Sequence, residues 1–257
     1  MIKAAFFDVD GTLLSYKTRQ VLPSAKAAIA KLQAQGILCV VATGRHMSQL
    51  EKLPVNEIPF DAFLTLNGQL MLDKEKNVLF GTPIEGEAKE FLVKAFNDHT
   101  YPAVMVEQNE MYLNYVTEHV KEVNRIISIA IPPLSDYRGG DIYQVCAYLR
   151  RSEEHLIDPI VEECVLTGWH YGGKDIIAKG GGKMAGIKRY LEEAGIKPEE
   201  IIAFGDAEND LEMIRFAGIG VAMGNAEESV KAVADYVTAD IDDDGIEKAL
   251  KHFGLME

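Results

Sequence analysis

The stretch AAFFDVDGTL, residues 4–13, places two carboxylates and a glycine directly after an apolar run typical of a buried strand. Side chains at positions i and i+2 of a strand project to the same side, so Asp8 and Asp10 can face one point. Two carboxylates that share a site repel each other and, unless one is protonated, such a pair usually implies a bound cation. Open parallel sheets bind ligands beyond the carboxyl ends of their strands. This position therefore favours a functional site over a turn with two solvated acids.

The composition is that of an ordinary globular protein. The chain has 257 residues, of which 47% are hydrophobic and 26% charged, and this length suits one large domain or two modest ones. Forty acidic residues against 26 basic ones give a net charge of −14, which opposes attraction to nucleic-acid phosphates and anionic membranes. We therefore expect no nucleic-acid partner and no membrane partner, while the oligomeric state stays open.

The cysteines and the apolar segments indicate the compartment. Cys39, Cys146 and Cys164 are widely spaced and form no C-x-x-C motif, which fits a reducing compartment better than a disulfide framework or a zinc site. No basic region followed by an apolar segment opens the sequence, and the apolar stretch Ile126–Pro133 is too short to cross a bilayer. Both observations predict a cytoplasmic protein.

Strand-like and helix-like segments alternate in the first and last thirds of the chain. The expected strands are residues 2–9, 37–42, 62–66, 201–204 and 219–222. The expected helices are residues 23–35, a short one from 47, then 183–194, 209–216 and 243–253. Such alternation predicts an α/β fold with a Rossmann-like parallel sheet and helices on both faces.

The middle of the chain predicts a different arrangement. The expected strands are residues 103–106 and 111–115, which form an antiparallel hairpin, followed by 142–149, 164–170 and 175–178. The expected helices are residues 85–96, 118–127 and 153–161. An α+β block thus interrupts an α/β chain, as inserted domains do at surface loops. We expect a discontinuous catalytic core at residues 1–82 and 179–257, with an inserted α+β domain at 83–178.

Further polar segments follow other predicted strands. Thr43–Arg45 offers a hydroxyl and backbone N–H groups to an anion. Gly205–Asp210 gathers acids at a strand end and a helix start, where the helix dipole alone could favour them. Gly180–Lys183 puts glycines and a lysine at a helix N-terminus, which suits a phosphate although it does not match the Walker pattern. Asn67-Gly68 is a strong turn signal after another strand.

Taken together, these motifs resemble the haloacid dehalogenase (HAD) superfamily of aspartate-based phosphohydrolases. The nearest branch is the Cof-type phosphatases, whose type IIB cap is inserted between the second and third motifs. The D-x-D-G-T-L and G-D-x-x-N-D elements carry most of the specificity, and the resemblance spans the whole chain. One motif departs from the pattern: the family often has K-G-x-S-K-G where Lys179–Met184 reads KGGGKM, although Lys183 keeps its register.

The resemblance implies a role for each motif residue. The implied catalytic residues are the nucleophile Asp8 and the acid/base Asp10. The implied phosphate-binding residues are Val9, Thr43, Gly44, Lys183 and Asn209, with Asn67 near the substrate phosphate. The implied metal ligands are Asp8, the backbone carbonyl of Asp10, and Asp206, with Asp210 orienting the metal shell from behind.

These residue types also suit phosphoryl transfer chemically. A carboxylate can attack phosphorus and form an aspartyl phosphate, which splits one hard displacement into two easier ones. Lysine, hydroxyl, backbone N–H groups and a hard cation such as Mg²⁺ with oxygen ligands neutralise the charge on the transferring group. We therefore predict a magnesium-dependent phosphoric monoester hydrolase acting on a small molecule. The resemblance implies substrates of the sugar phosphate, nucleotide or pyridoxal phosphate class.

Two other functions remain open from the sequence. A phosphomutase uses the same aspartate chemistry but returns the phosphoryl group to the sugar. A regulatory module could bind metal and phosphate without turnover.

Several polar residues are left out of the predicted site. Arg45 could guide an anionic substrate or form a surface salt bridge, and His46 is interpreted as a rim residue rather than a metal ligand. Asp240–Gly245 opens like a calcium-binding loop, but Lys251 stands where the loop needs glutamate, so we interpret it as a solvated acidic turn. Trp169–Tyr171 could stack on a substrate, but alternate residues of one strand more often divide between core and surface.

Overall fold

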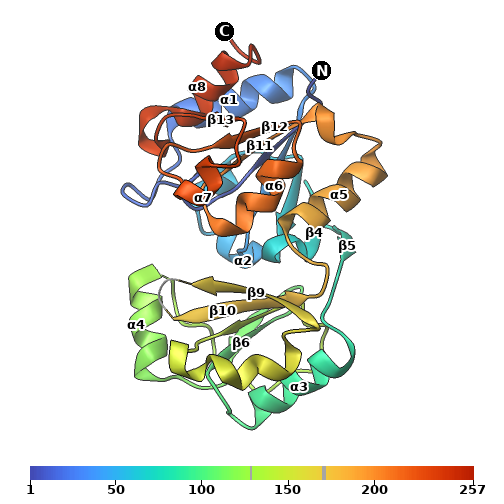
Figure 1. Ribbon diagram of the computed structural model, residues 1–257, viewed down its shortest axis with the longest axis vertical. Coiled ribbons are helices and arrows are strands. Elements are labelled where there is room, and N and C mark those ends of the chain that lie inside the picture. The colour runs from blue at the N-terminus through green and yellow to red at the C-terminus, as the bar shows by residue number, and fades with distance from the viewer. Residues whose placement is uncertain (128, 170–171) are drawn as a thin grey trace. The chain divides into compact units, whose positions relative to one another are not determined.

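The computed structural model describes residues 1–127, 129–169 and 172–257. It divides into two compact units (Figure 1). The core unit comprises Met1–Phe80 and Gly182–Glu257, and the inserted unit comprises Gly81–Gly181. The inserted unit therefore interrupts the core unit in sequence.

The core unit is built on an eight-stranded sheet with the strand order β13-β12-β11-β1-β2-β3-β4-β5. Its strands are β1 (Ala4–Phe7), β2 (Leu38–Ala42), β3 (Ala62–Thr65), β4 (Leu70–Asp73), β5 (Val78–Gly81), β11 (Ile201–Gly205), β12 (Ile219–Ala222) and β13 (Tyr236–Val237). The strands from β13 to β3 pair in parallel, whereas β4 is antiparallel to β3. The predicted α/β fold with a parallel sheet is confirmed, and it carries an antiparallel extension at one edge.

Helices cover both faces of this sheet. They are α1 (Pro23–Ala34), α2 (Met47–Leu50), α5 (Lys183–Ala194), α6 (Leu211–Phe216), α7 (Glu228–Lys231) and α8 (Gly245–His252). α1 packs against α8, and α5 packs against α6, on opposite faces (Figure 1). Right-handed crossovers explain this, because the chain moves along the sheet in one direction from β1 to β3 and in the other from β11 to β13. Local signals set the ends: Pro23 opens α1, and Gly195 ends α5 in the left-handed region at φ 65°.

The central strands lie in the core of this unit. Every residue of β1 is buried, as is every residue of β11, which is why both read as continuous apolar runs rather than alternating ones. Phe7 and Phe204 stack with ring centroids 5.1 Å apart. This packing fixes the carboxyl ends of β1 and β11 beside each other, where the first polar residues of both loops begin.

The inserted unit is a five-stranded antiparallel sheet with helices. Its strand order is β7-β6-β8-β10-β9, with β6 (Ala103–Val106), β7 (Met111–Leu113), β8 (Gln144–Ala147), β9 (Cys164–Trp169) and β10 (Gly173–Ala178). Its α-helices are α3 (Gly86–Asn97) and α4 (Glu118–Ile127). Leu92 and Phe96 of α3 belong to one buried apolar cluster with Tyr112, Val145 and Ile176 of the sheet. The predicted hairpin at 103–115 is confirmed.

Some elements differ from the sequence prediction. The short strands β4, β5 and β13 and the four-residue helix α7 were not predicted, because such short segments carry little periodicity. The predicted helix 153–161 is a run of 3₁₀ turns at Arg151–Ile160 with Pro159 inside it, since proline removes a backbone donor and clashes with the preceding turn. His170, the end of the predicted strand 164–170, lies outside the described residues. No helix in the described part of the chain is long and apolar enough to cross a membrane.

The N-terminal turns of α5 pack closely on the 3₁₀ turn Leu66–Gly68. A Cβ at Gly186 would lie 2.6 Å from Leu64 Cδ1 and 2.8 Å from the backbone oxygen of Gly68. Only a residue without a side chain fits here. Lys183 is the first residue of the same helix, so this contact also fixes the position of the Lys183 backbone.

We expect Gly186→Ala to destabilise the protein by about 1–3 kcal/mol through overpacking, although helix propensity alone predicts a gain of roughly 1 kcal/mol. Urea unfolding measures the change, with Lys188→Ala at an exposed position of the same helix as the control. An unfolding free energy for Gly186→Ala equal to or above that of the wild type would contradict the packing argument.

Candidate active site

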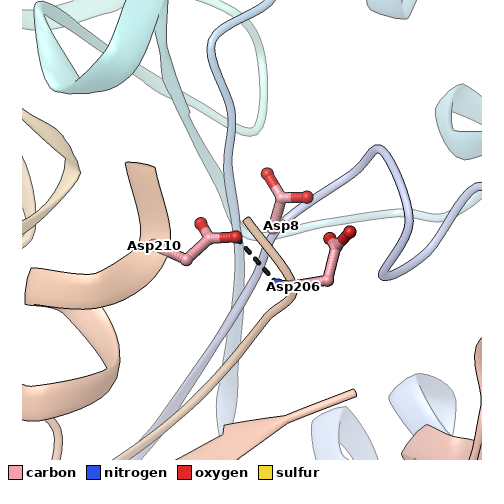
Figure 2. A group of neighbouring side chains, drawn as sticks. All are labelled: Asp8, Asp206 and Asp210. Atoms are coloured by element: carbon pink, nitrogen blue, oxygen red, sulfur yellow. Dashed lines mark hydrogen bonds between the residues drawn. The ribbon is translucent and has the colours of Figure 1, made fainter. Parts of the chain in front are cut away.

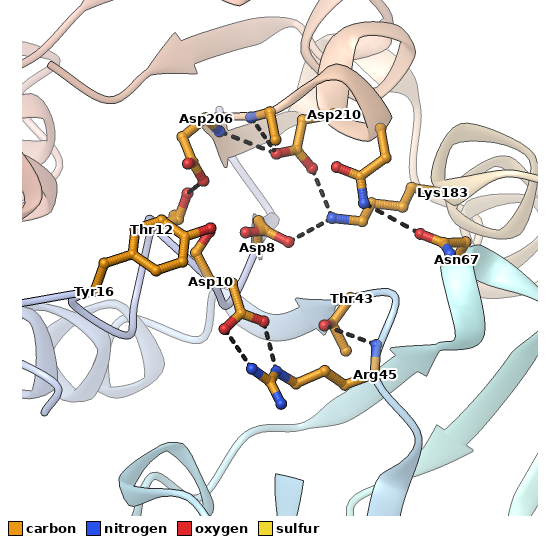
Figure 3. A network of polar contacts seen from close by, with 12 residues as sticks. Asp8, Asp10, Thr12, Tyr16, Thr43, Arg45, Asn67, Lys183, Asp206 and Asp210 are labelled. Carbon is orange, nitrogen blue, oxygen red and sulfur yellow. Dashed lines mark hydrogen bonds and ion pairs between the residues drawn. The ribbon is translucent and has the colours of Figure 1, made fainter. Parts of the chain in front are cut away.

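Polar residues from five segments of the core unit meet at the carboxyl edge of its sheet (Figure 3). They follow β1, β2, β3 and β11, and a further segment is the start of α5. Parallel pairing places these strand ends next to one another. The site is thus a direct consequence of the strand order.

Three carboxylates form the centre of the site. Asp8, Asp206 and Asp210 each offer an oxygen, and these oxygens lie within 4.8 Å of one another (Figure 2). All three side chains are buried, Asp210 completely. The structure therefore brings together Asp8, the predicted nucleophile, Asp206, the predicted metal ligand, and Asp210, which is predicted to orient the metal ligands.

Backbone hydrogen bonds hold these acids in place. The N–H of Asp8 donates to the carbonyl of Phe204 at 3.0 Å, which joins the loop after β1 to the end of β11. One oxygen of Asp210 accepts the backbone N–H groups of Asp206 and Ala207 at 3.0 and 3.2 Å. Asp210 therefore stabilises the loop Asp206–Asp210 and fixes the backbone of Asp206 close to Asp8.

Lys183 connects the acids from the other side. Its Nζ donates to Asp8 Oδ1, and to Asp210 Oδ1 at 2.7 Å, and its side chain is only 1% exposed. The lysine can reach this depth because α5 starts against the turn at Gly68, where a Cβ would lie 2.2 Å from the backbone oxygen of Gly182. Glycine at 68, with φ +88°, is required by this close approach.

Burial and crowding shift the titration of the cluster. Burial, and then the charge of Asp210, raise the pKa of Asp8 to about 7. Burial, and then the charge of Asp8, raise the pKa of Asp206 to about 9. Burial alone would lower the pKa of Lys183, but Asp210 and Asp8 raise it above its ordinary value. Burial thus disfavours the charged form of both acids, and the repulsion between the carboxylates adds to this effect.

The donor set fits a divalent metal ion. Carboxylate and carbonyl oxygens are the ligands of hard cations, and both oxygens of Asp210 already accept hydrogen bonds. Asp206 keeps one oxygen for a cation, since its Oδ1 accepts from the Thr12 hydroxyl at 3.0 Å. Asp8 and Asp206 are therefore the better placed ligands, and Asp210 the better placed support. The cluster of Asp8, Asp206 and Asp210 is thus compatible with a divalent metal ion.

Asp10 is held at two points. Its carboxylate makes a two-point ion pair with Arg45, Nε to Oδ2 at 2.5 Å and Nη2 to Oδ1 at 2.7 Å. Its backbone carbonyl, the predicted metal ligand, accepts from the Tyr16 hydroxyl at 3.0 Å. A carbonyl oxygen has two lone pairs, so this bond leaves one for a cation. Burial, and then the charge of Asp206, raise the pKa of Tyr16, which keeps its hydroxyl a donor.

The remaining predicted phosphate-site residues lie on three segments, namely the loop after β2, the turn after β3 and the loop after β11. Thr43 is buried, and its Oγ1 accepts the backbone N–H of Arg45 at 3.2 Å. Asn67 lies against Gly44, where a Cβ would be 3.0 Å from Asn67 Oδ1, and the same oxygen accepts from Asn209 Nδ2 at 3.1 Å. Asn67 therefore links the loop after β2 to the loop after β11.

Val9 lies between the two aspartates of the first motif. The whole residue is buried. Its use in phosphate binding stays a prediction.

Several contacts of the site were not predicted from the sequence. Neither role considered for Arg45 included the pair with Asp10, and the Arg45 side chain is only 14% exposed, so the pair is not a surface salt bridge. No sequence motif indicated the contact of Tyr16 with Asp10. Asn225 bridges Gly11 and Ile241, donating to the first at 2.7 Å and accepting from the second at 2.9 Å. Thr12, by contrast, stood inside the quoted motif and could have been found.

The interpretation of His46 as a rim residue was wrong. His46 is 3% exposed and caps the N-terminus of α2, where its ring accepts the backbone N–H of Ser48. The acidic stretch is a turn, as predicted, in which Asp240 caps a 3₁₀ helix and Asp242 pairs with Lys17 at 3.0 Å. Of the aromatic residues considered for stacking, His170 and Tyr171 lie outside the described residues.

Comparison with known proteins identifies the family. The model of the haloacid dehalogenase-like hydrolase family matches residues 5–250. A solved structure of BT1666, described among HAD phosphatases and from Bacteroides thetaiotaomicron, has a TM-score of 0.90 and 33% identity, covering 100% of this chain and 96% of that one. The HAD subclass IIB sugar phosphatase BT4131 has a TM-score of 0.85 and 35% identity, covering 99% of this chain and all of that one.

A curated relative carries a more specific name. The pyridoxal phosphate phosphatase YbhA of Escherichia coli (strain K12) is 28% identical over 93% of this chain and 94% of its own length. The family model, the fold and these relatives agree with the motif residues assembled at the sheet edge. The chain therefore belongs to the haloacid dehalogenase-like hydrolases and is an enzyme of their Cof-type phosphatase branch.

Proposed function

We propose that this enzyme is a magnesium-dependent phosphomonoesterase that hydrolyses a small phosphorylated metabolite through an aspartyl-phosphate intermediate. The observation that carries the proposal is the buried carboxylate of Asp8, held by Lys183 beside Asp206 at the carboxyl edge of the sheet. A nucleophile, a fixed positive charge and a cation-binding oxygen thus stand within one small volume.

The first step forms the intermediate. An oxygen of Asp8 attacks the phosphorus atom, and the bond from phosphorus to the alcohol oxygen breaks as Asp10, which enters this step protonated, donates its proton to that oxygen. In the second step a water attacks the phosphorus, loses its proton to Asp10, and releases inorganic phosphate and free Asp8. The two steps return both aspartates to their starting states.

Fixed donors would hold the transferring group. Lys183, the Thr43 hydroxyl and the backbone N–H groups of Val9 and Gly44 supply positive charge or hydrogen bonds that need no rearrangement during reaction. The amide of Asn209 is fixed by its bond to Asn67. Asn67 therefore acts on the phosphate site through Asn209.

Mg²⁺ would be held by the carboxylates of Asp8 and Asp206 and by the backbone carbonyl of Asp10. When bound, it supplies charge neutralisation for phosphoryl transfer. Asp210 contributes by fixing Asp206 and Lys183, to which it is hydrogen-bonded. Supporting groups of this kind commonly set the orientation of metal ligands.

Substrate class and domain roles are part of the proposal. One relative is named a sugar phosphatase and another a pyridoxal phosphate phosphatase, which supports a small phosphorylated metabolite as substrate. We infer that the α+β insertion at residues 83–178 acts as a type IIB cap on the core at 1–82 and 179–257. Lids of this kind commonly admit substrate and exclude water.

We expect the enzyme to release inorganic phosphate from p-nitrophenyl phosphate with Mg²⁺ and to lose this activity in EDTA. Asp8→Asn should abolish turnover because an amide cannot act as the nucleophile. Equal activity with EDTA, or none with Mg²⁺, would overturn the proposal. Isomerised sugar phosphate formed without free phosphate would instead indicate a phosphomutase.

Asp10→Asn should slow hydrolysis of the intermediate, because the water would lose its general base, by about 10²–10⁴-fold. Rapid-quench trapping should then show more phosphorylated enzyme than in the wild type. The double variant with Asp8→Asn should trap none. Breakdown as fast as in the wild type would mean that Asp10 is not the acid/base.

The acidic cluster should make the metal-free protein less stable as pH rises. The pKa values of Asp8 and Asp206 are raised from 3.8 to about 7 and about 9, so between pH 4 and 9 the folded state holds more protons than the unfolded state. Its stability therefore falls as pH rises through this window. Mg²⁺, which binds the ionised folded form, should restore stability most strongly at pH 9.

Thermal unfolding at pH 6 and pH 9, in EDTA and in excess Mg²⁺, measures both effects. Asp206→Asn removes one of the two carboxyl groups with a raised pKa and should reduce the loss of stability between pH 6 and pH 9. Asp98→Asn at an exposed position serves as the control. A midpoint in EDTA that increases from pH 6 to pH 9 would contradict the charge argument.

A further inference from the structure

Both oxygens of the Asp10 carboxylate are bound by one residue. Arg45 Nε donates to Oδ2 at 2.5 Å and Arg45 Nη2 donates to Oδ1 at 2.7 Å (Figure 3). This is a side-on, two-point contact, which fixes the plane of the carboxylate as well as its position. A single-point contact would leave the carboxylate free to rotate.

Arg45 is itself held firmly. Its backbone N–H donates to Thr43 Oγ1 at 3.2 Å, and its carbonyl accepts the backbone N–H of Leu66 at 3.2 Å. Its side chain is 14% exposed, against 27% for Asp10. The guanidinium therefore belongs to the scaffold of the loop after β2 and is not a mobile surface group.

The geometry restricts how Asp10 can exchange protons. A carboxylate has about four lone-pair positions, and the guanidinium occupies one on each oxygen. The other two remain, and their directions are set by the plane that Arg45 fixes. Reacting groups that are misplaced by about 1 Å can lose 10²-fold in rate, so the fixed plane is relevant to the proposed proton transfers.

We propose that Arg45 is a positioning residue that holds the carboxylate of Asp10 in one orientation for proton transfer to the leaving group and from water. This inference rests on the proposed function and deepens it. Arg45 acts through Asp10, so its removal should lower kcat and leave substrate affinity unchanged.

A double-mutant cycle between Arg45 and Asp10 tests this directly. The variants are Arg45→Gln, Arg45→Lys, Asp10→Asn and the pair Arg45→Gln with Asp10→Asn, assayed with p-nitrophenyl phosphate and Mg²⁺. Arg45→Gln should lower kcat by about 10–10²-fold, with KM and inhibition by inorganic phosphate unchanged. In the Asp10→Asn background, Arg45→Gln should cause no further loss, because residues that act as one unit are not additive.

The lysine variant separates geometry from charge. Lysine keeps the positive charge but cannot form the two-point contact, so Arg45→Lys should recover less than half of the lost kcat. Full recovery of kcat by Arg45→Lys would overturn the proposed role of the two-point contact. A rise in KM together with weaker phosphate inhibition would also overturn it, since Arg45 would then bind the substrate phosphate directly.

Controls separate this inference from the proposed function and from folding. Arg189→Gln removes an arginine that stacks on Phe80 and pairs with Glu193 at 3.4 Å, and should leave turnover unchanged. A wild type that releases no phosphate, or turnover that survives Asp8→Asn, would overturn the proposed function and this inference with it. Suppose that the wild type releases phosphate and Asp8→Asn abolishes turnover, as expected. If Arg45→Gln then lowers kcat as much in the Asp10→Asn background as in the wild type, only the Arg45 inference is overturned. Thermal midpoints of all variants confirm that the folded protein is being compared.

Discussion

A buried lysine between buried carboxylates is the constraint on which the rest of the core unit depends. Lys183 is 1% exposed and bonds to both Asp8 and Asp210. Removing one partner of a buried ion pair leaves an uncompensated charge, which is strongly destabilising. β1, β11 and α5 must therefore keep a single relative placement. The glycine contacts between the turn at Gly68 and the start of α5 are the local means by which the sequence meets this requirement.

The same cluster is not optimised for stability alone. With its three carboxylates ionised, the lysine leaves two negative charges, which is the charge that one divalent cation balances. Burial, and then the repulsion between carboxylates, raise the pKa values of Asp8 and Asp206. Asp10 pairs with Arg45 instead of Lys183, although its charge still contributes to the raised pKa of Asp8. Functional sites often retain such unfavourable arrangements, and under the proposed function one group of charges would bind the metal while the other would transfer protons.

Much of this arrangement could be predicted from the sequence because it depends on local rules. Apolar runs, Pro23 and Gly195 mark element ends by backbone chemistry, and parallel strands must bring Asp8 and Asp206 to one edge. The pair of Asp10 with Arg45 could not be predicted in the same way, since it depends on a rotamer and on the shape of two loops. The short edge strands carry too little periodicity to be predicted, whereas the 3₁₀ run follows from Pro159, which the helix prediction at 153–161 did not take into account. The functional division into core and cap remains a prediction.

The residues proposed for the chemistry all belong to the core unit. Asp8, Thr43, Lys183 and Asp206 lie within Met1–Phe80 and Gly182–Glu257, although the chain between them forms a separate sheet with its own buried cluster. The polar network is closed by hydrogen bonds within the core unit, so changes in the inserted sheet need not disturb it. A fold organised in this way can keep one phosphoryl-transfer site while the insertion varies. Related phosphatases named for a sugar and for pyridoxal phosphate are consistent with that separation.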